Sequence, residues 1–283
     1  MTNIKTVTVL GAGTMGHGIA HAAIAAGYET RLFDTEPAAL DKARSAIEAI
    51  VRKGVELGKV AAHDGDTMLR RLSGSSDLPQ ALGDADLVIE AAPERIELKL
   101  RLFADIERFA PARAVIASNT SALSITEMAA TLRVPSRAAG MHFFNPVHKM
   151  KLIEIVQALE TAPATLDAIA GVAARMGKET VLVRESPGFI TTRVNASLGN
   201  EAFYMLMEGV ASARDIDKAL KLGLNHPMGP FELVDLVGLD TRLSILQYLH
   251  RSMGEKYRAC PLLVQYVNAG RLGRKVGRGV YDY

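Results

Sequence analysis

Short apolar runs and segments of helical period alternate along the first 185 residues of this chain. The opening run, TVTVL at 6–10, is crowded with apolar and β-branched residues, as is typical of a strand buried on both faces of a parallel sheet. Comparable runs predict strands at 28–33, 87–90, 114–117, 138–144, 151–156 and 180–183, and helical periodicity predicts helices at 14–26, 37–57 and 95–109. This alternation predicts an α/β fold of the doubly wound, Rossmann type with a mostly parallel sheet.

The pattern changes at Ser186-Pro187-Gly188, after which only helical periodicity continues. Helices are predicted at 189–208, 213–222, 230–253 and 261–269, separated by glycines and prolines. We therefore expect two domains, with residues 1–185 forming the doubly wound domain and residues 186–283 a helical, substrate-binding domain.

Composition narrows the class of protein. The formal net charge is only +2, so the totals predict no strong field for nucleic acid or a membrane. The single cysteine, Cys260, excludes an internal disulfide and favours a reducing compartment. The first predicted strand begins too early to leave room for a signal peptide, and no apolar run approaches the ~18 residues of a membrane span. We expect a cytoplasmic protein.

A glycine-rich turn follows the first predicted strand, with the sequence Gly11-Ala12-Gly13-Thr14-Met15-Gly16. In a dinucleotide site the first glycine permits a tight turn, the second lets the backbone approach a pyrophosphate, and the third lets the next helix pack closely. The amides of Thr14, Met15 and Gly16 would face the phosphates. The same glycines could also serve packing alone, but the strand, turn and helix context favours a dinucleotide site.

Asp34 ends the second predicted strand, 18 residues after Gly16. A carboxylate at this position can accept both hydroxyls of an adenosine ribose and repel a 2′-phosphate. The sequence therefore predicts NAD rather than NADP as the cofactor.

Polar side chains follow two later strands at the sheet edge where ligands of open α/β sheets bind. Glu90 and Glu94 lie at and just past the end of one strand, and Ser118-Asn119-Thr120-Ser121 follows the next. Such clusters are most often helix caps, but here they also form a candidate contact surface.

Glu154 lies in an otherwise apolar predicted strand, on the same face as Leu152 and Val156. A buried carboxylate requires a partner, which either His142 or His148 could supply. Pairing His142 with Glu154 would orient the imidazole and stabilise its charged form, as suits a general base. From the pattern alone, a structural ion pair is equally well supported.

Two basic segments could contact anions. Lys53 and Lys59, near the end of the predicted helix at 37–57, either lie on a solvated helix face or contact a phosphorylated part of the substrate. The glycine-rich basic segment 270–279 could bind phosphate, but it lacks the interleaved aromatics of a nucleic-acid site.

Several motifs in this order resemble the 3-hydroxyacyl-CoA dehydrogenase family, in particular its short-chain bacterial members. They are GAGTMG (11–16), SNTSALSIT (118–126), HFFNPVHKMKLIEIV (142–156), SPGFI (186–190), HPMGPFEL (226–233), DLVGLD (235–240) and GRKVGRGVYDY (273–283). The resemblance covers nearly the whole chain. It implies reversible, NAD-dependent oxidation of 3-hydroxybutyryl-CoA or another short-chain (3S)-3-hydroxyacyl-CoA.

The resemblance also implies roles for single residues. His142 would take the proton of the 3-hydroxyl as hydride passes to the nicotinamide, and Glu154 would orient His142. Ser121 would contact substrate and nicotinamide. Four further positions would line NAD, namely Glu94, Lys99, Asn145 and Lys275. No metal is implied.

Thr192 departs from the family pattern, because many members carry an asparagine there that helps to bind the substrate carbonyl. A threonine is shorter and offers a hydroxyl in place of an amide. The resemblance further implies a homodimer formed through the helical domain. Two alternatives stay open, a dehydrogenase of a free hydroxy acid and a non-catalytic NAD-binding protein.

Overall fold

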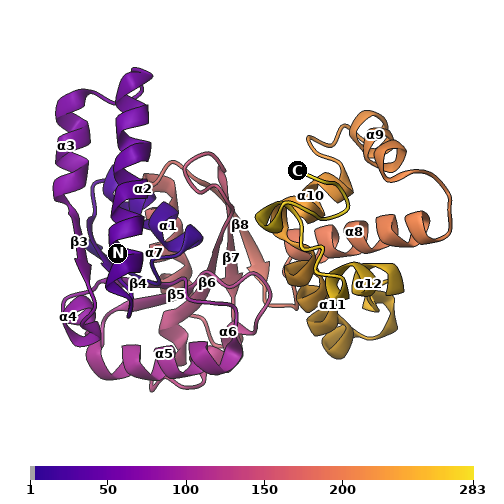
Figure 1. Ribbon diagram of the computed structural model, residues 1–283. Coiled ribbons are helices and arrows are strands. Elements are labelled where there is room, and N and C mark those ends of the chain that lie inside the picture. Colours follow the sequence, from indigo (N-terminus) through magenta and orange to yellow (C-terminus); the bar gives the residue numbers. More distant parts are fainter. Residues whose placement is uncertain (1–3) are drawn as a thin grey trace. The chain divides into compact units, whose positions relative to one another are not determined.

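The computed structural model describes residues 4–283, which divide into two compact units on either side of the Ser186–Pro187 bond (Figure 1). The first unit contains a sheet of eight strands in the order β3-β2-β1-β4-β5-β6-β7-β8. They are β1 (Thr6–Leu10), β2 (Glu29–Phe33), β3 (Leu72–Ser75), β4 (Leu87–Glu90), β5 (Val115–Ser118), β6 (Ala138–Phe143), β7 (Leu152–Gln157) and β8 (Glu179–Arg184).

The direction of the strands confirms the predicted doubly wound, mostly parallel sheet. All neighbours from β3 through β6 are parallel, β7 is antiparallel to β6, and β8 is parallel to β7. The strand order reverses beside β1, because the chain moves outward to β2 and β3 and then returns to β4. A crevice for ligands forms at the carboxyl ends of the strands at such a reversal.

Helices cover both faces of the sheet (Figure 1). One face carries α1 (Thr14–Ala25), α2 (Pro37–Glu56) and α7 (Pro163–Arg175), and the other carries α4 (Leu78–Leu82), α5 (Ile96–Phe109) and α6 (Ile125–Ala129). The remaining helix, α3 (Ala62–Arg70), contacts α2, and the 3-10 turn η1 (Pro135–Arg137) precedes β6. Alternate residues of β1 enter opposite layers, with Val7 and Val9 packing beneath α1, so this strand is buried on both sides.

The second unit is entirely helical in its regular structure. It comprises α8 (Thr191–Met207), α9 (Ala213–Gly223), α10 (Pro230–Val237), α11 (Leu239–Met253), α12 (Pro261–Asn268) and the 3-10 turns η2 (Glu255–Tyr257) and η3 (Arg274–Val276). Its core includes an edge-to-face contact between Phe203 and Phe231, whose ring centroids are 5.2 Å apart. None of the helices between residues 4 and 283 is long and apolar enough to cross a membrane.

The single helix predicted at 230–253 is wrong, since the segment forms two helices that meet at Gly238. Gly238 has φ +105°, outside the helical region, and a Cβ there would lie 2.9 Å from Asp240 Oδ1. The apolar period continues across the break, which is why the pattern does not reveal it.

Candidate active site

The loop between β1 and α1 has the geometry of a phosphate-binding turn. Gly11 has φ +102°, and a Cβ there would lie 2.8 Å from the carbonyl oxygen of Ala91. A Cβ on Gly16 would lie 1.7 Å from the carbonyl oxygen of Gly11, so glycine lets α1 pack directly on the turn. Gly13 is exposed, and the space where its Cβ would stand is open to at least 4 Å. Because α1 has no side-chain cap, the amides of its first turn can bind the oxygens of a pyrophosphate.

Asp34 lies against the same turn, at the end of β2. Its Oδ2 accepts the backbone N–H of Ala12 at 2.8 Å, and its Oδ1 accepts that of Glu36 at 3.1 Å. The carboxylate is only partly buried and keeps lone pairs for further donors. The turn and Asp34 together therefore fit a dinucleotide with an unmodified ribose.

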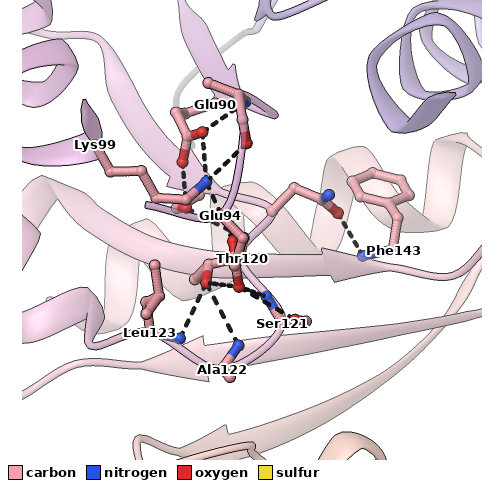
Figure 2. Close-up of polar contacts among 11 residues, drawn as sticks. Glu90, Glu94, Lys99, Thr120, Ser121, Ala122, Leu123 and Phe143 are labelled. Atoms are coloured by element: carbon pink, nitrogen blue, oxygen red, sulfur yellow. Dashed lines mark hydrogen bonds and ion pairs between the residues drawn. The ribbon is translucent and has the colours of Figure 1, made fainter. Parts of the chain in front are cut away.

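A buried ion pair lies at the carboxyl end of β4 (Figure 2). Lys99 and Glu90 are 1% and 0% exposed, and Lys99 Nζ donates to Glu90 Oε1 at 2.6 Å. The other oxygen, Oε2, accepts the hydroxyl of Ser118 at 2.5 Å, and Oε1 also accepts the amide of Ala92 at 2.7 Å. Both charges are paired and hydrogen-bonded, which is the condition under which a protein interior tolerates them.

Glu94 extends this network to the loop after β5 (Figure 2). Lys99 Nζ lies 3.4 Å from Glu94 Oε2. The other oxygen, Oε1, accepts the hydroxyl of Thr120 at 2.6 Å and both the amide and the hydroxyl of Ser121, at 2.9 and 3.1 Å. Glu94 thus fixes the Ser121 hydroxyl, while Lys99 balances the charge of Glu94.

His142 and Glu154 face each other across the antiparallel pair β6 and β7, where they are direct register partners. His142 Nδ1 lies 2.7 Å from Glu154 Oε2, and the carboxylate is fully buried. Since a carboxylate only accepts, Nδ1 carries the hydrogen of this bond and Nε2 is the nitrogen that can exchange a proton with a ligand. Of the two histidines that the sequence offers as partners for Glu154, the structure therefore selects His142.

Asn119 ties the end of β5 to the residue after His142. Its side-chain Oδ1 accepts the backbone N–H of Phe143 at 2.9 Å (Figure 2), and its backbone N–H donates to the backbone carbonyl of Glu90 at 2.8 Å. One residue thus connects the backbone segments that carry the two buried pairs of the site. Asn145, predicted to line NAD, is exposed two residues further along the same edge.

His148 belongs to a different cluster. Its ring lies 6.2 Å from that of His21 on α1 and meets it edge to face. Burial, followed by the neighbouring charges of His148, Lys178 and His17, lowers the pKa of His21 to about 4.

The two lysines predicted to contact a substrate phosphate are both exposed, at and just beyond the end of α2. Lys53 Nζ lies 2.9 Å from Glu56 Oε2, one turn away on the same helix, and Lys59 follows the helix. Their geometry fits a solvated helix end, and their contact with substrate stays a prediction.

Two predicted residues lie in the helical unit. Thr192 is partly buried in the first turn of α8. Lys275 lies in η3, and its Nζ contacts both carboxylate oxygens of Asp240, at 2.7 and 2.6 Å. Asp240 thus fixes the position of the Lys275 ammonium group.

The contacts that join these residues were not predicted. Glu90 and the Ser118–Ser121 segment were expected only as polar groups at a sheet edge, and Lys99 was not expected to be buried against Glu90. One feature of the sequence could have indicated this burial: Lys99 lies on the same side of α5 as the buried Phe103 and Ile106.

Among residues 4–283, no cluster of three or more His, Cys, Asp or Glu side chains could hold a metal ion.

The glycine turn fits a pyrophosphate, and the Asp34 carboxylate beside it fits a ribose. Together with a histidine held by a buried acid, these features define the chain as an NAD-dependent oxidoreductase. The family model for the 3-hydroxyacyl-CoA dehydrogenase NAD-binding domain matches residues 6–186, and that for the C-terminal domain of the same family matches residues 188–283. The chain belongs to the 3-hydroxyacyl-CoA dehydrogenase family, and NAD is its cofactor.

Individual relatives are similar over nearly the full length of this chain. A probable 3-hydroxybutyryl-CoA dehydrogenase of Bacillus subtilis is 45% identical over 99% of this chain and 98% of its own. A 3-hydroxyadipyl-CoA dehydrogenase of Escherichia coli is 42% identical over 100% of this chain and 60% of its own. The crystal structure of (S)-3-hydroxybutyryl-CoA dehydrogenase from Ralstonia eutropha superimposes with a TM-score of 0.95 at 40% identity, covering 99% of both chains.

Proposed function

We propose that this enzyme oxidises a short-chain (3S)-3-hydroxyacyl-CoA, such as 3-hydroxybutyryl-CoA, to the 3-oxoacyl-CoA, and that the reaction is reversible. The observation that supports this most directly is the His142–Glu154 pair at the carboxyl end of β6, on the same sheet edge as the glycine turn. The names of the relatives support the choice of an acyl-CoA substrate.

Bound NAD would supply the hydride acceptor for C3 of the substrate. Beyond the glycine turn, we assign its contacts to Asp34, Glu94, Lys99, Ser121, Asn145 and Lys275. Lys99 would act through Glu94, because its ammonium group is buried against two carboxylates.

His142 is the proposed general base. Its Nε2 takes the proton of the 3-hydroxyl as C3 gives up two electrons with its hydrogen, and it returns the proton in the reverse direction. Glu154 accepts the hydrogen bond from Nδ1, which keeps Nε2 in its proton-accepting form and stabilises the imidazolium that results.

Substrate contacts are assigned to Ser121 and Thr192 near the reacting carbon, and to Lys53 and Lys59 for the CoA phosphates. The Ser121 hydroxyl, which Glu94 orients, would donate or accept a hydrogen bond at the 3-oxygen. We also propose a cytoplasmic homodimer that forms through residues 186–283. Light scattering after gel filtration tests the oligomeric state.

The decisive experiment is turnover of acetoacetyl-CoA with NADH, followed by NADH absorbance, beside free acetoacetate at the same concentration. We expect turnover of the thioester only. If only the free acid is turned over, the substrate is a free hydroxy acid and not an acyl-CoA. If NADH binds but neither compound is turned over, the result favours a non-catalytic protein. The names of the relatives differ in the acyl chain, hydroxybutyryl in one and hydroxyadipyl in another.

A further inference from the structure

Arg242, on the second turn of α11, is a buried cation without an acidic partner. The residue is 3% exposed, and no carboxylate between residues 4 and 283 forms an ion pair with it. Its Nε has no hydrogen-bond partner in this part of the chain. Burial alone lowers the pKa of the guanidinium to about 10, so the group stays charged at neutral pH.

Stability does not explain this arginine. A buried charge without a counter-ion is unfavourable, and an apolar side chain of similar size would fit an interior position better. Arg242 also interrupts an apolar row on α11, formed with the buried Leu239, Leu243, Leu246 and Leu249. A guanidinium held in this way has the chemistry of a carboxylate-binding group.

The neighbouring helix provides space for the guanidinium. A Cβ on Gly199 of α8 would lie 3.7 Å from Arg242 Nε and 3.0 Å from Val234 Cγ2. Any larger side chain at Gly199 would therefore compete with Arg242 for the same volume. The arginine lies in the interior formed by α8, α10 and α11.

Gly199 lies on the same face of α8 as Thr192 and Asn195, which precede it by seven and four residues. Both are partly buried polar residues, whereas Gly199 and Arg242 are buried. Thr192 and Asn195 thus form a polar row on the face of α8 that carries Gly199, the residue beside Arg242, and Gly199 is about 10 Å along the helix axis from Thr192.

If Thr192 contacts the reacting end of the substrate, as the proposed function has it, the acyl chain beyond C3 can follow this row. The CoA phosphates lie at the opposite end of the substrate molecule. An anion that reaches Arg242 along this path would be carried by the end of the acyl chain. We propose that the preferred substrate is a short 3-hydroxyacyl-CoA whose acyl chain ends in a second carboxylate, and that Arg242 binds this carboxylate.

Two thioesters of equal chain length test the proposal, 3-oxoadipyl-CoA and 3-oxohexanoyl-CoA, because they share CoA and differ only in the terminal group. With NADH, we expect the wild-type kcat/KM to be at least ~10-fold higher for the adipyl substrate. Arg242→Met should lower the adipyl value by ~30-fold or more, mainly through KM, and change the hexanoyl value less than about threefold.

Matched variants separate charge from packing. Arg242→Lys keeps a charge without the bidentate fork, so it should recover part of the adipyl activity. Arg251→Met removes an exposed arginine from the same helix and should leave both substrates unaffected. Circular dichroism checks that each variant is folded. The ratio of the two kcat/KM values of the wild-type enzyme, adipyl over hexanoyl, tests the preference for a terminal carboxylate without any variant.

The outcomes separate this inference from the proposed function. Turnover of 3-oxohexanoyl-CoA equal to or faster than that of 3-oxoadipyl-CoA would overturn the carboxylate assignment and leave the acyl-CoA dehydrogenase intact. An adipyl preference that survives in Arg242→Met would reject Arg242 as its cause. Turnover of neither thioester would reject the proposed function itself.

Discussion

The two units of this enzyme hold their buried charges in different ways. In the first unit each buried charge of the site has a charged or ionisable partner from the same unit, as in Lys99 with Glu90 and His142 with Glu154. Arg242 of the helical unit forms no ion pair with any carboxylate of residues 4–283. A network that is complete by itself is already arranged before ligands arrive, which suits groups that act on every substrate in the same way. A charge left to be completed by a ligand suits discrimination between substrates.

The buried acids of the helical unit sharpen this contrast, because they hold backbone rather than cations. Asp217 accepts the amides of Phe231 and Glu232, at 2.8 and 3.1 Å, and the hydroxyl of Tyr281 at 2.7 Å. Asp235 accepts the amides of Val280 and Tyr281 in the C-terminal segment. These carboxylates fasten α10 and the end of the chain, so neither is available to neutralise Arg242.

Removing the proposed base should have the largest effect on the first unit. For His142→Ala we expect kcat to fall by ~10³-fold or more, because proton transfer is lost together with the imidazolium that Glu154 stabilises. NADH binding, measured by fluorescence, should be unchanged, since the glycine turn and Asp34 remain. His148→Ala is the control and should retain most activity. Full turnover of His142→Ala would exclude His142 as the base.

Breaking the buried ion pair should destabilise the first unit. Lys99→Met leaves Glu90 buried without its cation and should cost about 3 kcal/mol of unfolding free energy, measured by urea denaturation. Adding Glu90→Gln should restore part of the loss, because the fully buried carboxylate left without its cation is then replaced by a neutral amide. Arg242→Met should instead leave stability unchanged or raise it. If Lys99→Met and Arg242→Met lose equal amounts of unfolding free energy, Arg242 is as well paired as Lys99. The contrast between the two units would then disappear.

The charge of Asp34 should matter less. Asp34→Asn can still accept the amide of Ala12, so the turn keeps its shape while the repulsion of a 2′-phosphate is removed. We expect the preference for NADH over NADPH, as a ratio of kcat/KM, to fall by ~10-fold. An unaltered ratio would assign cofactor selection to another residue.

The smallest effect concerns acid stability and the histidines of α1. The pKa of His21 is about 4 in the folded protein and ordinarily near 6.5, so the unfolded chain takes up a proton first as the pH falls. This contribution to stability is complete above pH ~6.5 and is lost progressively toward pH ~4, amounting to about 1–2 kcal/mol at pH ~5 for a ring with some solvent contact. His21→Gln should lose less stability than the wild type between pH ~7.5 and ~5 in urea titrations. Parallel losses in the two proteins would assign the acid sensitivity to other groups.

Much of the fold was predictable because its central strands, such as β4, β5 and β6, are buried on both faces, and the resulting apolar runs are easy to recognise. The edge strand β3, with the sequence LSGS, has no such signal, since two of its four residues are exposed. Helices α4 and α6 have five residues each, too few to establish a period. Helix α7 is rich in alanine, so its buried and exposed faces differ little in hydrophobicity.

The candidate site was predictable where the chemistry lies within one short segment. The glycine turn is a local motif, and Glu154 stood out as an acid in an apolar strand. The Glu90, Lys99 and Ser118 network joins side chains from three separate segments, and a single sequence does not show which of them meet. Arg242 left a weak signal, a charge in register with buried leucines, which periodicity alone cannot distinguish from an exposed position.

The reversal of direction at β7 has a consequence for how the enzyme assembles. It makes neighbours of His142 and Glu154, which are only 12 residues apart in the sequence, whereas the glycine turn is completed by Ala91, which is 80 residues from Gly11. Closing a short loop loses less chain entropy than joining distant segments, so local contacts tend to form early in folding. We expect the proposed catalytic pair to form before the proposed cofactor site, and variants that disturb the long crossovers to lose NAD binding while the β6–β7 pairing persists.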